Sequence, residues 1–282
     1  MNSDDSDMEN MNEVDVAELL EAFGTIGSEQ IVESDEGAAS TDEPETLQTE
    51  ILKAQIQQLQ FADQVINNDL PTIAIATQSS VVIVAAKMQA NCLVVSDSIM
   101  RMENISKYIA IAYAGLAGDF RELTKSAAKL YYDNIMKHNA EMRGKQVAND
   151  LRKTILKNAQ LPKLRPFAIQ LLIGNWSNDH GHLYQLDSYG TLKSPNFACI
   201  GRNAKEANGY LKKMNLSETN TVESTILFGI HALKLALETE VICPFELDVG
   251  IIDCNGFRYL SQEVISENLY TLFTLKYPEV VK

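Results

Sequence analysis

Two apolar runs between residues 71 and 87 constrain the fold more than any other part of the chain. The runs, 72–77 and 81–86, are rich in β-branched residues, and the polar break Gln78-Ser79-Ser80 separates them. β-Branched side chains suit a pleated sheet, and two such runs around a short polar break are typical of adjacent antiparallel strands. The sequence therefore predicts a β-hairpin that begins directly after Pro71.

Helical and strand patterns alternate through the rest of the chain. A helix with an apolar stripe is expected at 47–66, and further helices are expected at 118–138, 144–158, 204–214, 223–239 and 261–275. Additional strands are expected at 91–96, 107–113, 167–174, 182–187, 195–200, 246–253 and 256–260, and the segment Asp253-Cys254-Asn255-Gly256 supplies the turn between the last two. This order predicts an α+β fold with two antiparallel sheets between layers of helices.

The first 46 residues differ in composition from the rest. They hold 15 acidic residues and no lysine or arginine, whereas residues 47–282 carry one more basic than acidic residue. A segment of this charge with few large apolar groups cannot bury enough surface to offset its chain entropy, so we expect 1–46 to be disordered and 47–282 to form the folded domain. Inside the acidic segment, five apolar residues are spaced as one face of a short helix, which is either transient or a docking motif: Val14, Val16, Leu19, Leu20 and Phe23.

Composition also argues against several classes of function. Neither part of the chain has a large positive excess, so we expect no nucleic-acid partner. No apolar run approaches the roughly 20 residues that span a bilayer, and the N-terminus has no secretory signal pattern. We expect no cofactor and no metal; His180 and His182 lie on a polar turn, where solvated histidines are common. The four scattered cysteines indicate reduced thiols in the cytoplasm or nucleus: Cys92, Cys199, Cys243 and Cys254.

The predicted hairpin resembles the opening of the proteasome-type N-terminal nucleophile fold, a four-layer αββα sandwich. The downstream motifs resemble the alpha branch of that family, and among its members most resemble the subunit usually numbered two. The segments that carry the resemblance are Ile109–Gly115, Arg165-Pro166-Phe167, Leu183–Gly190 and Asp248–Leu260. The resemblance implies a non-catalytic structural subunit of the alpha ring of the 20S core particle. It also implies, as partners, the other alpha and beta subunits and the activators or regulatory particle, and a role in ubiquitin-dependent degradation.

The residues at the catalytic places of the fold argue against an enzyme. In catalytic beta subunits the hairpin begins with a nucleophilic threonine, but here Pro71 has that place and Thr72 is the nearest hydroxyl. Lys87 stands where those subunits have an aspartate, and Arg101 stands where they have a lysine. A guanidinium stays charged at neutral pH and cannot relay a proton. A threonine hydrolase is therefore disfavoured.

Two binding roles follow from the resemblance. Arg101 matches the basic residue of alpha subunits that receives the C-terminal carboxylate of an activator, and arginine can hold a carboxylate with two hydrogen bonds. Leu59, Phe61 and Ala62 fall on the helix through which alpha subunits contact each other. The stripe of this helix has no obvious partner within the domain, which predicts that it is covered by other subunits.

The N-terminus departs from the family pattern. No Tyr-Asp-Arg cluster, which positions the gating tail of alpha subunits, occurs in residues 1–60. This departure keeps open an alternative function, in which the chain is a divergent paralogue that acts as an assembly or regulatory factor outside the mature particle.

Overall fold

The computed structural model describes residues 43–88, 93–95, 98–161, 164–214, 221–239 and 241–276. It divides the chain into two units that meet between Leu52 and Lys53, and the described part of the first unit is the beginning of one helix. Residues 1–42 of the acidic segment, including the short helical motif, lie outside the described residues. Residues 43–46 are described and begin a helix, so the expectation of disorder was wrong for these four residues. A domain boundary at residue 46 stays a prediction.

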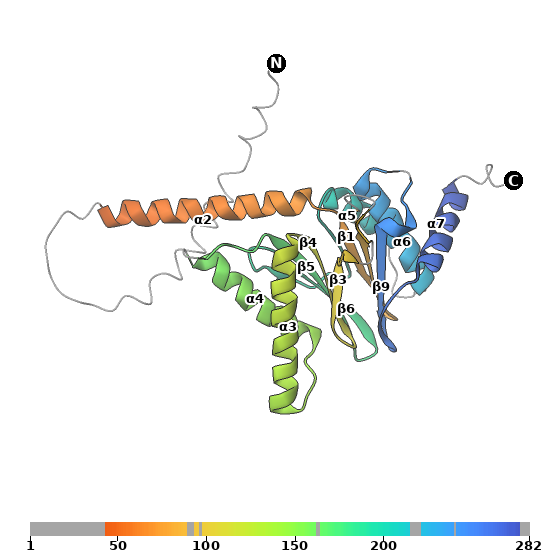
Figure 1. Ribbon diagram of the computed structural model, residues 1–282, viewed down its shortest axis with the longest axis horizontal. Coiled ribbons are helices and arrows are strands. Elements are labelled where there is room, and N and C mark those ends of the chain that lie inside the picture. Colours follow the sequence, from red (N-terminus) through yellow and green to blue (C-terminus); the bar gives the residue numbers. More distant parts are fainter. Residues whose placement is uncertain are drawn as a thin grey trace, which may run out of the picture. The chain divides into compact units, whose positions relative to one another are not determined.

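The second unit alternates strands and helices in the order that the sequence predicts (Figure 1). The helices are α2 (Glu43–Asn68), α3 (Ala117–His138), α4 (Gly144–Gln160), α5 (Ala204–Lys213), α6 (Val222–Leu237), η2 (Pro244–Glu246, a 3-10 turn) and α7 (Gln262–Lys276). The strands are β1 (Thr72–Ala76), β2 (Val81–Ala86), β3 (Met102–Ser106), β4 (Ile109–Gly115), β5 (Ile169–Ser177), β6 (His180–Leu186), β7 (Leu192–Lys193), β8 (Phe197–Ile200), β9 (Leu247–Asp253) and β10 (Gly256–Tyr259). None of the described helices is both long enough and apolar enough to cross a membrane.

The strands form two five-stranded sheets in which every pair is antiparallel. The first sheet has the order β10-β9-β2-β1-β8 and the second the order β3-β4-β5-β6-β7. Every side chain of β2 is buried, because this strand lies inside a sheet whose two faces are both covered. The predicted hairpin is confirmed: β1 pairs with β2 from Thr72 opposite Ala85 to Ala76 opposite Val81.

Three apolar clusters define four layers. Side chains of β1, β2 and β9 pack against α5, α6 and α7, and side chains of β4, β5 and β6 pack against α3 and α4. A third cluster fills the space between the two sheets. Figure 1 shows α3 and α4 against one sheet and α6 and α7 against the other. The α+β sandwich of two antiparallel sheets is therefore confirmed.

Two local predictions were wrong. Residues 93–95, the described part of the expected strand 91–96, are not in a strand, and Leu93 and Val95 are exposed rather than packed on a sheet. The expected strand 107–113 is β4, which begins two residues later; β3, which pairs with it through a turn at Lys107 and Tyr108, was not expected. The last hairpin is confirmed, since Cys254 and Asn255 form the turn and Gly256 is paired with Asp253.

Candidate functional site

Pro71, at the start of β1, offers no group for nucleophilic chemistry. It is buried within the chain, and its carbonyl oxygen accepts a hydrogen bond of 3.1 Å from the backbone N–H of Ala86. The neighbouring Thr72 hydroxyl is also buried and donates to the carbonyl oxygen of Tyr113 at 2.9 Å. Acyl transfer by this fold requires an activated hydroxyl and a base. Here the ring nitrogen is part of a peptide bond and the nearest hydroxyl is held by the main chain.

Arg101 lies directly beside this position as a buried side chain, and both of its terminal nitrogens donate hydrogen bonds. Only 5% of the residue is exposed. Its Nη1 donates to Asp69 Oδ2 at 3.0 Å, and its Nη2 donates to the carbonyl oxygen of Leu70 at 2.9 Å. The guanidinium carbon lies 4.6 Å from the centre of the Tyr113 ring, a cation–π distance. The guanidinium thus connects the start of β3, the α2–β1 link and β4.

Asp69 is the second half of this arrangement, which we call the Arg101–Asp69 clamp. The same Oδ2 that accepts from Arg101 also accepts from the backbone N–H of Gly115 at 2.7 Å. The Asp69 carbonyl oxygen accepts from the backbone N–H of Arg202 at 2.9 Å. Asp69, which directly follows α2, therefore binds the main chain at the end of β4 and just after β8. Its carboxylate also neutralises the charge of Arg101.

The clamp bears on the predicted role of Arg101. A carboxylate from outside the chain would meet a guanidinium whose Nη1 is already occupied by Asp69. Carboxylate binding at Arg101 stays a prediction. An incoming group that binds Nη1 has to displace the Asp69 side chain, which is partly exposed.

Lys87 does not take part in the clamp. It ends β2, and its ammonium forms an ion pair of 2.7 Å with Asp248 Oδ1 on β9. The three residues at the catalytic places therefore lie in different surroundings: Pro71 in a buried main-chain contact, Arg101 with Asp69, and Lys87 with Asp248. The structure does not bring Lys87 and Arg101 together in one ion-pair network.

The three residues predicted to contact other subunits are placed differently. Leu59 (2% exposed) and Ala62 are buried within the chain, whereas Phe61 is 60% exposed. Ile66, further along the same stripe, belongs to the cluster between the sheets. The expectation that the stripe lacks a partner within the domain was therefore wrong, because one face of α2 is covered by the chain's own core. Contact with another subunit stays a prediction, and Phe61 is the residue of the three that is exposed for it.

Phe61 borders an apolar groove of about 320 Å³ that we call the α2 groove. The groove runs between α2 and the segments that follow β4 and precede β5. Its lining residues are Gln58, Phe61, Ala62, Val65, Leu116, Arg165, Pro166 and Ala168. Arg165 is held in place by Asp119 of α3, which also accepts from the backbone N–H of Ala168 at 2.9 Å. The wall of the groove is thus fixed by an ion pair.

Sequence reasoning missed the acidic partners in these arrangements. Asp69 pairs with Arg101, Asp248 pairs with Lys87, and Asp63 of α2 accepts hydrogen bonds from the hydroxyls of Ser188 and Tyr189. Each partner is more than 30 residues away in the chain. No local pattern marks such pairs, so only the packing of the sheets reveals them.

Comparisons with known proteins found a matching family model and several similar proteins. The family model described as "Proteasome subunit" matches residues 67–252. "Proteasome subunit alpha type-2" of Drosophila melanogaster is 27% identical over 215 residues, which cover 76% of this chain and 91% of the relative. The protein of the same name from Caenorhabditis elegans is 28% identical over 222 residues, 77% of this chain and 93% of the relative.

An archaeal protein is similar over nearly the same length. "Proteasome subunit alpha" of Metallosphaera sedula is 25% identical over 210 residues, which cover 74% of this chain and 87% of the relative. The matched family region begins at the end of α2 and extends through β9 up to Ile252. It therefore contains the Arg101–Asp69 clamp and Pro71.

Proposed function

Because the chain belongs to the proteasome subunit family, as a divergent alpha-type member, we propose that it is a non-catalytic structural subunit of the alpha ring of the 20S core particle. In that role it contacts other alpha and beta subunits and supports ubiquitin-dependent protein degradation in the cytoplasm and nucleus. The observation that carries the proposal is the combination of a family match over most of the folded unit with a buried proline at the nucleophile position.

The absence of catalysis rests on the surroundings of Pro71. Cleavage of the chain before Thr72 would free an amine and a hydroxyl there, but that hydroxyl is buried and donates to the Tyr113 carbonyl oxygen. Arg101 has the place of the proton-relaying lysine and is neutralised by Asp69. Nucleophile, base and relay are therefore all missing from the described arrangement around residue 71.

The α2 groove supports the structural role. It is apolar along Phe61, Val65 and Leu116, and all three side chains are exposed in the isolated chain. A neighbouring subunit that inserts an apolar side chain there would remove this surface from water, which contributes roughly 25 cal/mol for each Å² that is buried. We propose the groove as the contact of α2 with the next subunit of the ring.

Phe61→Glu should prevent incorporation into particles without unfolding the chain. The side chain is exposed, so the substitution should change the free energy of unfolding by no more than about 0.5 kcal/mol, yet it puts a charge into an apolar contact. The measurement is native mass and co-purification after co-expression with the other alpha and beta subunits. Gln64→Glu is the matched control, because it adds the same charge on an exposed part of α2 outside the groove lining.

Two outcomes would contradict this prediction. If the Phe61→Glu chain enters particles as well as the Gln64→Glu chain, the α2 groove is not a ring contact. If the unaltered chain stays outside particles as a soluble monomer, the alternative of an assembly or regulatory factor replaces the ring subunit. Leu59 is unsuitable for this test because a charge at that buried position should unfold the chain.

The same proposal includes docking of an activator at Arg101. The Asp69 carboxylate then competes with the activator's carboxylate for the Arg101 guanidinium. Asp69→Asn keeps an oxygen for the Arg101 and Gly115 donors but removes the negative charge. Assembled particles with this variant should bind a short peptide with a free C-terminal carboxylate at least about tenfold more tightly than unaltered particles, a gain of about 1.4 kcal/mol. The amidated form of the same peptide should show no gain. Equal affinities of both particles for the free acid would exclude Arg101 as the carboxylate receptor.

A further inference from the structure

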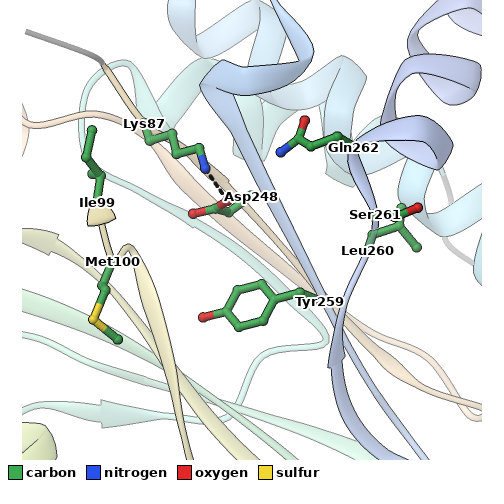
Figure 2. Close-up of a pocket in the computed structure, with 8 residues that line it drawn as sticks. All are labelled: Lys87, Ile99, Met100, Asp248, Tyr259, Leu260, Ser261 and Gln262. Atoms are coloured by element: carbon green, nitrogen blue, oxygen red, sulfur yellow. Dashed lines mark hydrogen bonds and ion pairs between the residues drawn. The ribbon is translucent and has the colours of Figure 1, made fainter. Parts of the chain in front are cut away.

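A second cavity lies on the other side of β2 and is separate from the clamp and from the α2 groove. It encloses about 380 Å³ between the end of β2, the residues before β3 and the link from β10 to α7. Figure 2 shows the Lys87–Asp248 ion pair with the Gln262 amide on one side of it and the Tyr259 ring below it. The lining residues are Lys87, Ile99, Met100, Asp248, Tyr259, Leu260, Ser261 and Gln262.

The Lys87 ammonium is the most unusual group in this cavity. Its side chain is only 3% exposed, and among the described residues Asp248 Oδ1 is the single acceptor that the structure gives it. An ammonium carries three N–H donors, and buried polar groups are nearly always hydrogen-bonded. Two donors of a buried cation are therefore available to acceptors inside the cavity. Asp248 already balances the positive charge, so these acceptors need no charge of their own.

Two further groups extend the polar side of the cavity. The amide of Gln262 lies across from Lys87, with its nitrogen on the side of the ion pair (Figure 2). Its Oε1 is buried and accepts no hydrogen bond from the described part of the chain. The Tyr259 hydroxyl donates to the Met102 carbonyl oxygen at 2.7 Å. Burial raises the pKa of Tyr259 to about 12, so this phenol stays protonated and keeps its lone pairs for donors in the cavity.

The opposite wall is apolar and partly exposed. Met100 lines the cavity and is 54% exposed, and Met88, the residue directly after Lys87, is also exposed. Methionine is flexible and polarisable, and surfaces rich in it adapt to apolar side chains of partners.

We propose that this cavity binds an extended segment of a partner protein. The main-chain carbonyl oxygens of the segment accept from Lys87 and Gln262, and one apolar side chain lies between Met100 and Tyr259. A neutral peptide group fits because it offers both acceptors and donors, as this lining requires, whereas a free carboxylate gains nothing from a lysine that Asp248 has neutralised. The proposal goes beyond the ring contact and does not depend on it, since neither Phe61 nor Arg101 lines this cavity.

The test uses the full chain with carbon-13 in its methionine methyl groups, titrated with the blocked peptide acetyl-Gly-Leu-Gly-amide. We expect a saturable shift of the signal of Met100, which lines the cavity, assigned with Met100→Leu, at peptide concentrations up to about 20 mM. Met136 on α3 is exposed but does not line the cavity, so its signal should stay in place. The peptide acetyl-Gly-Asp-Gly-amide, which lacks the apolar side chain, should bind at least about fivefold more weakly.

Gln262→Leu should weaken binding of the leucine peptide at least about fivefold, because it removes the amide that donates to the main-chain carbonyl oxygen of the peptide in this proposal. Glu267→Gln is the control: it changes an exposed residue of α7 that does not line the cavity and should leave the affinity unchanged, and a thermal unfolding curve checks that both variants fold. Shifts that do not saturate, equal shifts at Met136, equal affinity for the acidic peptide, or full affinity of a folded Gln262→Leu protein would each overturn the proposal.

Discussion

Replacing Arg101 with methionine should lower the free energy of unfolding by about 3 to 5 kcal/mol. Methionine fills much of the same space but leaves the Asp69 carboxylate without its cation. Asp69 would keep the Gly115 N–H but lose the guanidinium hydrogen bond, and the Leu70 carbonyl oxygen would lose its donor as well. Urea unfolding followed by circular dichroism measures this loss.

Two further variants test whether the loss in the free energy of unfolding comes from breaking the Arg101–Asp69 clamp or from removing any cation. Lys145→Met removes an exposed lysine near the start of α4 and should change stability by less than about 0.5 kcal/mol. Adding Asp69→Leu to Arg101→Met should recover part of the lost stability, because no uncompensated charge remains. A double variant no more stable than Arg101→Met would show that the uncompensated charge of Asp69 is not the reason for the effect.

Gly115→Ala should be at least as damaging, at about 3 kcal/mol or more. Gly115 ends β4 with φ of +122°, a conformation that side chains strongly disfavour. A Cβ atom there would lie 2.2 Å from the Ala168 carbonyl oxygen, which belongs to the main chain and cannot rotate away. The strand end would have to shift, and the Gly115 N–H would then move away from Asp69. Thermal unfolding of the full chain measures the effect.

Gly118→Ala is the matched control three residues later. This glycine lies in the first turn of α3, and a Cβ atom there meets no other atom within 4 Å. Alanine favours the helix, so stability should stay the same or rise by up to about 1 kcal/mol. A loss of similar size in both variants would mean that the conformation at Gly115 is not what limits the substitution.

The sequence by itself determined the elements whose patterns are local. The β-branched runs around Gln78-Ser79-Ser80 predict the β1–β2 hairpin, because two such runs joined by a short polar break are typical of adjacent antiparallel strands. The helices α3 to α7 begin and end within two residues of the predicted bounds. β3 was missed because its buried residues, Met102 and Ile105, are three positions apart and so show no two-residue alternation; the register with β4 shifts between Asn104 and Ser106.

Only the tertiary structure decided which charged and apolar groups are available for binding. The sequence identified Arg101 and Lys87 by their places in the family pattern, but it did not indicate that Asp69 and Asp248 neutralise them. Likewise, Leu59, Phe61 and Ala62 are neighbours on one helix. Leu59 and Ala62 are buried within the chain, whereas Phe61 is exposed. The physical reason is the same in each case: burial and ion pairing depend on segments distant in the chain, and the packing of the two sheets alone brings those segments together.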